Sequence, residues 1–119
     1  MLLTVSNHTI SLNDDYAVIV PHPNTEISET TIRNITRSIA NTDFQPKSYI
    51  FHAHNHLHVS FCAMQHMMKL KKVNVGVVSG SARTRQIFYS LKYMSPGIEI
   101  FHNLKDAEDW LTIKNQPQN

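Results

Sequence analysis

The fold of this chain is organised around the stretch YIFHAHNHLHVS, residues 49–60. Its first three residues are aromatic or β-branched, which are the side chains that suit a pleated, half-buried strand. From Phe51 onward the pattern alternates with a period of two, so a continuing strand would place four histidines on one face. These are His52, His54, His56 and His58. The stretch therefore predicts a buried strand that runs out into a histidine-rich edge.

The four imidazoles do not suit a dry core, because each ring has a nitrogen that needs a hydrogen-bond partner. Either the sheet ends near Ala53 and the later histidines lie in a loop, or this face borders water, a ligand or a metal. We favour the first interpretation. Periodicity alone does not separate the two.

Further strands are predicted on both sides of this stretch. Residues 16–20 and 73–78 are near-continuous apolar runs, as expected of strands that are buried on both faces. Residues 98–101 form a short alternating strand. Residues 1–5 suit an edge strand, and residues 7–11 offer turn chemistry.

Helices are predicted between these strands. The first begins at Thr25 or Ser28 and buries a stripe of isoleucines at helical spacing. The second covers residues 61–70 with Ser60 as its N-cap, and the fourth begins at Asp106. The third follows Gly80-Ser81, and its predicted inner stripe consists of Ile87, Phe88, Leu91 and Met94, with Arg83, Arg85 and Lys92 facing outward.

This alternation of strands and helices predicts an α/β domain of the βαβαβαβα type. We expect one domain over residues 1–119, with a core at about residues 12–113 and a flexible tail at 114–119. We expect a sheet of about four to five strands, mainly parallel, with right-handed crossovers.

Composition excludes several classes of protein. The formal charge is +2 and the basic residues are scattered apart from Lys69, Lys71 and Lys72, which does not favour nucleic-acid binding. The single cysteine, Cys62, allows no intramolecular disulfide, which suits a reducing compartment. No apolar run reaches membrane-spanning length and no signal peptide is recognisable. We therefore expect a cytoplasmic protein without a membrane span.

The second half of the chain resembles a known family. Residues 73–81 read VNVGVVSGS, and after a helical segment residues 97–111 read GIEIFHNLKDAEDWL. A strand, a phenylalanine, an acidic turn and an Ala-x-x-Trp-Leu helix in this order are similar to the SpoIIAA-like branch of the STAS superfamily, the anti-sigma-factor antagonists. The element order agrees over residues 12–113.

The resemblance implies a small sheet with helices mostly on one face, and a regulatory module that acts by binding a protein partner. In the anti-sigma-factor antagonists a serine at the start of the helix after the third strand is phosphorylated, and the matching position here is Ser60. Ser60 is also interpreted as a plain N-cap. Phosphate at a helix N-terminus would be electrostatically tolerated.

Two clusters of residues are candidate sites. The histidine row, His52, His54, His56 and His58, offers His-x-His pairs that point the same way and can share zinc, nickel or copper. We expect no resident cofactor, and expect zinc or nickel there to bind adventitiously. The second cluster is Ser79, Gly80, Ser81 and Arg83, where a strand turns into a helix whose free N–H groups can hold an anion. The competing interpretation is a tight turn with Ser81 as N-cap.

Two classes of function follow. The first is a non-enzymatic regulatory or ligand-binding module that acts through an unknown protein partner, with the chain as a homodimer. The second is a small metal-binding protein that uses the row from His52 to His58. A lesser alternative within the first class is a module that binds a lipid or a small apolar ligand.

Overall fold

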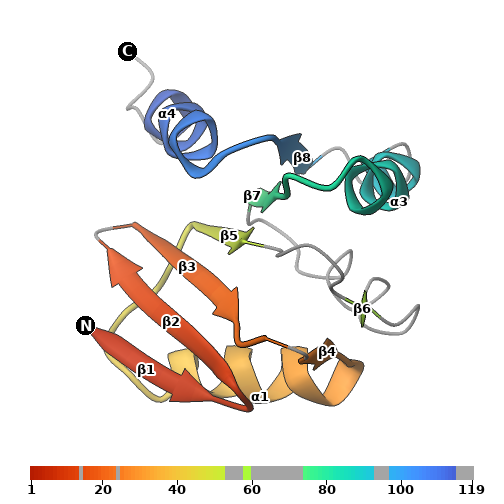
Figure 1. Ribbon diagram of the computed structural model, residues 1–119. Helices are drawn as coiled ribbons and strands as arrows, with labels where there is room; N and C mark the ends of the chain where they lie inside the picture. The colour runs from red at the N-terminus through yellow and green to blue at the C-terminus, as the bar shows by residue number, and fades with distance from the viewer. Residues whose placement is uncertain (14, 24, 53–57, 60–73, 93–96, 115–119) are drawn as a thin grey trace.

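The computed structural model describes residues 1–13, 15–23, 25–52, 58–59, 74–92 and 97–114 of the chain. They form a mixed α/β fold around a six-stranded sheet, as Figure 1 shows. The strands of this sheet are β1 (Leu2–Val5), β2 (His8–Asn13), β3 (Tyr16–Pro21), β5 (Ser48–His52), β7 (Asn74–Val78) and β8 (Ile98–Phe101). The predicted α/β class is confirmed.

The strand order is β1-β2-β3-β5-β7-β8. Strands β1, β2 and β3 pair in antiparallel fashion, whereas β3, β5, β7 and β8 run parallel, so three of the five pairings are parallel. The parallel strands succeed one another in space as they do in sequence, which is the arrangement that repeated right-handed crossovers on one face produce. The organising strand β5 therefore lies inside the sheet, between β3 and β7.

The sheet has more strands than the sequence predicts, because residues 8–13 form β2 rather than a turn. The turn is shorter than expected and consists of Ser6 and Asn7, whose φ angles of 49° and 62° lie in the left-handed region. Two such residues between antiparallel strands give the twist of a tight hairpin. The buried core therefore begins before residue 12, because Ile10 on β2 is fully buried.

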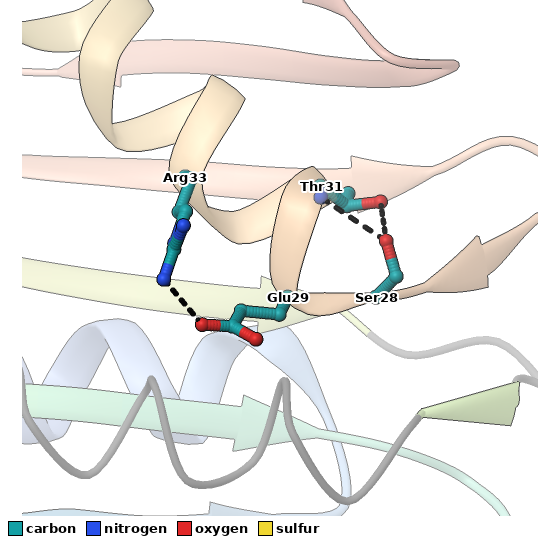
Figure 2. Close-up of polar contacts among 4 residues, drawn as sticks. All are labelled: Ser28, Glu29, Thr31 and Arg33. Carbon is teal, nitrogen blue, oxygen red and sulfur yellow. Dashed lines mark hydrogen bonds and ion pairs between the residues drawn. The ribbon is translucent and has the colours of Figure 1, made fainter.

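Helix α1 (Glu29–Ala40) begins where the sequence predicts a cap. Figure 2 shows that the hydroxyl of Ser28 accepts a hydrogen bond from the backbone N–H of Thr31 at 3.2 Å, so Ser28 rather than Thr25 is the N-cap. Glu29 in the first turn pairs with Arg33 at 2.6 Å on the exposed side. The opposite side buries Ile32, Ile35 and Ile39, as predicted.

The described helices cover both faces of the sheet. Side chains of α1 and of α3 (Ala82–Lys92) share one apolar cluster with the strands, for example Ile35 and Phe88. Helix α4 (Leu104–Lys114) packs in a separate cluster with Val18 and Ile50, whose side chains point to the other face. Two of the three helices in the described ranges thus lie on one face, and α4 closes the other (Figure 1).

Helix α3 corrects one part of the predicted inner stripe. Phe88 is buried as expected, but Ile87 is 46% exposed and Thr84 is buried in its place. Thr84 and Phe88 lie four residues apart and share the buried face, whereas Ile87 is rotated by about 100° from Phe88 and lies at the exposed border of that face. Arg83 is exposed as predicted, whereas Arg85 is only half-exposed. Met94 and the side chain of Leu91 lie outside the described residues.

Helix α4 begins at Leu104, two residues earlier than predicted, because Asn103 caps it. The side-chain oxygen of Asn103 accepts from the backbone N–H of Asp106 at 2.9 Å. The helix is tied to the sheet by a hydrogen bond of 2.7 Å that the hydroxyl of Tyr16 on β3 donates to Glu108. Its Trp110 packs on Phe101 at the end of β8, with ring centroids 5.4 Å apart.

A separate pair of short strands lies beside the main sheet. Strand β4 (Glu26–Ile27) pairs in parallel with β6 (His58–Val59), and Glu26 stands opposite His58 in the register. This pair links the segment that follows β3 to the end of the histidine row.

Candidate functional site

The carboxyl ends of the four parallel strands lie at one edge of the sheet, where open α/β sheets bind ligands. A histidine stands at three of these ends. His22 follows β3, His52 is the last residue of β5 and His102 follows β8. Strand β7 is instead followed by Ser79. Parallel pairing therefore brings His52 of the histidine row and Ser79 of the second cluster to the same edge.

Two residues of the histidine row, His52 and His58, lie in described strands. His52 is the last described residue of strand β5, and residues 53–57 lie outside the described part of the chain, so the expected end of the sheet near Ala53 stays a prediction. His58 is not in a loop, however, because its backbone belongs to β6 of the small sheet. His54, His56 and the proposed phosphorylation site Ser60 lie outside the described residues, as does the predicted helix 61–70. Within the described part of the chain, no three His, Cys, Asp or Glu residues are grouped to hold a metal ion.

The turn after β7 has the N-cap geometry that the sequence predicts. The hydroxyl of Ser81 accepts from the backbone N–H of Thr84 at 3.3 Å, and the hydroxyl of Ser79 accepts from the N–H of Ser81 at 3.1 Å. Both serine side chains are therefore engaged within the turn. Ser79 is fully buried, while Gly80 and Arg83 are exposed. Anion binding by these four residues stays a prediction.

Among the residues at this edge, Arg85 is the best candidate to bind a ligand. The sequence predicts instead that it faces outward with Arg83. The Nη1 of Arg85 donates a hydrogen bond of 2.9 Å to the backbone oxygen of Ser79, which fixes the guanidinium against the turn. Beside it is a surface hollow of about 350 Å³. The described residues that line it are Ala82, Arg85, Gln86, Tyr89 and His102.

Sequence reasoning missed this hollow, although a usable signal was present. Ala82, Arg85, Gln86 and Tyr89 recur at helical spacing along one side of α3. His102 occupies the position directly after a predicted strand, where a polar side chain reaches the edge of the sheet. Arg83, which lies two positions from Arg85, does not line the hollow.

A second unpredicted feature at this edge is a buried histidine, His8, which stands opposite Pro21 in the register of β2 and β3. Its Nδ1 lies 2.7 Å from the backbone oxygen of Ser6. A carbonyl oxygen only accepts, so Nδ1 carries the proton. The buried Nε2 has no hydrogen-bond partner among the described residues. Burial lowers the pKa of His8 from 6.5, the hydrogen bond to Ser6 opposes this, and nearby His22 adds to the lowering.

This histidine predicts how stability depends on pH. Because the folded pKa lies below the unfolded value of 6.5, the unfolded state binds more protons between the two values. The contribution of His8 to stability is therefore complete above pH 6.5 and is lost as the pH falls through the folded pKa. Urea unfolding at several pH values should show a smaller acid loss for His8→Asn, which removes the titration and keeps a donor for Ser6. An unchanged loss would contradict the assignment.

Comparisons with known proteins leave the resemblance to the STAS superfamily as a prediction. No protein-family model matches this chain, and neither the curated proteins nor the solved structures give a match. None of the helices in the described ranges is long and apolar enough to cross a membrane.

Proposed function

We propose that the chain is a non-enzymatic binding module of the STAS or SpoIIAA-like type, which acts through protein–protein contacts and self-associates through strand β1. The observation that carries this proposal is the unprotected edge of the sheet at β1 (Figure 1). An edge strand presents unpaired N–H and C=O groups, which form a template for pairing with another strand.

Strand β1 carries no charged side chain, proline or bulge that would hinder such pairing. Natural edge strands are commonly guarded by charged side chains, prolines or bulges. Residues 1–13 contain no Asp, Glu, Lys, Arg or Pro, and the pairing of β1 with β2 runs in regular register. Leu3 and Val5 pack against the core, whereas Leu2 is 71% exposed. Strand β1 is therefore held by the side chains of Leu3 and Val5 and by its pairing with β2, while its other edge has no neighbouring strand in the described sheet.

The order of the parallel strands also supports the proposal. Strands β3, β5, β7 and β8 succeed one another with α1 and α3 on one face, and the resemblance implies helices mostly on one face. The antiparallel hairpin β1–β2 extends this unit at one side, so a partner that pairs with β1 would add to the sheet without disturbing the parallel strands.

A second copy of the chain is the partner that suits this edge. Most soluble oligomers are symmetric, and a two-fold axis would pair β1 with β1 in antiparallel fashion. Because β1 has no charged residue, such pairing brings no like charges together. The result would be one continuous sheet across two subunits, joined by main-chain hydrogen bonds.

Sedimentation velocity over a range of protein concentrations tests this proposal. The wild type should pass from monomer to dimer as the concentration rises. Thr4→Lys, at an exposed position of β1, should weaken the dimer by at least about tenfold, because two-fold pairing brings two lysines into one short strand pair.

Ser90→Lys is the matched control, because it adds the same charge at an exposed position of α3. It should dimerise like the wild type. The proposal would be overturned by a wild type that stays monomeric throughout, or by a Thr4→Lys variant that dimerises as well as the control.

A further inference from the structure

The hollow beside α3 has the size of a small-molecule site. Its volume of about 350 Å³ lies near the lower end of the range for ligand pockets, and is more than a single ion needs. Two elements build it: one side of α3 supplies four of its described lining residues, and His102 after β8 supplies the fifth. It lies at the carboxyl edge of the parallel strands, next to the end of β7.

The charge of the hollow favours an anion. None of the described residues that line it is acidic, and Arg85 forms no ion pair within the described part of the chain. A guanidinium has five N–H donors, and the hydrogen bond to Ser79 uses one of them. That bond also orients the group, so less side-chain entropy is lost when a ligand binds. His102 and Gln86 add further polar groups on the same hollow.

The helix N-terminus beside the hollow is not what holds the ligand. The hydroxyl of Ser81 already accepts from the backbone N–H of Thr84, and the hydroxyl of Ser79 accepts from the N–H of Ser81. The side chains that line the hollow lie along α3 as far as Tyr89, two turns from its start. Binding would therefore depend on side chains from two elements.

Tyr89 adds an aromatic ring to the lining of the hollow. Tyr89 is 44% exposed, so its ring offers a flat surface and its hydroxyl a polar tip. We propose that the hollow binds a small organic anion, in which a carboxylate or phosphate group contacts Arg85 and His102 and a flat apolar body lies against Tyr89. Charge-assisted hydrogen bonds from a guanidinium to such a group are short and directional.

Two-dimensional NMR titrations with benzoate and with phenyl phosphate test this inference and show which anionic group is preferred. At least one probe should produce saturable shifts at the amides of residues 82–89 and 102, with a dissociation constant on the order of 1 mM. Benzyl alcohol, which has the ring without the charge, should bind at least about tenfold more weakly. Equal binding of benzyl alcohol, or no saturable shift with either anion, would overturn the inference.

Matched variants then locate the site. Arg85→Gln should weaken binding by about tenfold or more, while Arg83→Gln, which removes the same charge from the same helix, should stay within about twofold of the wild type. Because Arg85 also supports the turn, His102→Ala at an exposed position provides a second variant, which should weaken binding by at least about threefold. Equal losses for both arginine variants, or no loss for His102→Ala, would contradict the assignment. These outcomes are independent of dimer formation through β1.

Discussion

Ile50→Ala is expected to lower the free energy of unfolding by about 2–5 kcal/mol, the largest effect that we predict for a single side chain. Ile50 is fully buried on the organising strand β5, where it stands between Val18 of β3 and Gly76 of β7. It shares an apolar cluster with Leu111 of α4. Truncation to alanine leaves a cavity that the sheet and the helix cannot easily close.

Urea unfolding at neutral pH measures this loss, and the structure provides a matched control. Ile113 on α4 is 71% exposed, so Ile113→Ala should change stability by no more than about 0.5 kcal/mol. If Ile50→Ala lost less than about 1 kcal/mol, the packing of α4 on this face of β5 would be wrong.

The second large effect is expected at Gly76, over which the aromatic pair Phe101 and Trp110 lies. A Cβ at position 76 would stand 3.4 Å from a ring carbon of Trp110 and 3.5 Å from one of Phe101. Alanine therefore fits at van der Waals distance, whereas the two methyl groups of valine extend into the rings. Gly76→Val should destabilise the fold by about 1–3 kcal/mol through overpacking.

Gly76→Ala provides the control, because it should be neutral or slightly stabilising in an extended strand. The measurement is urea unfolding monitored by tryptophan fluorescence. Trp110 is the single tryptophan of the chain, and its ring lies next to position 76. A valine variant as stable as the alanine variant would show that α4 does not press its tryptophan onto β7.

The parallel part of the sheet could be predicted because its strands are nearly continuous apolar runs. Residues 16–20 and 73–78 have no polar face, and this pattern is typical of strands covered on both sides. Strand β2 could not be found in this way. Its sequence HTISLN alternates, and the residues before it take left-handed backbone angles that non-glycine residues seldom adopt. The sequence therefore predicts turn chemistry at residues 7–11 instead of a strand.

The site was predicted less well than the fold, for a geometric reason. The turn at Ser79–Ser81 and the cap at Ser81 follow from local chemistry and were located correctly. The choice between Arg83 and Arg85 depends instead on how α3 is rotated about its axis, which Thr84 and Phe88 decide by facing the sheet. His102 joins the hollow only because β8 lies next to β7. Neither fact can be obtained from spacing within one segment.

We expect the β1 edge of the sheet to pair with a second copy of the chain. Amide hydrogen exchange of residues 2–5, measured at low and at high protein concentration, tests it most directly. We predict that the outward-pointing amides of β1 exchange freely in dilute protein and become protected as the concentration rises, while Thr4→Lys removes that protection. Exchange of these amides at rates independent of concentration would contradict the claim.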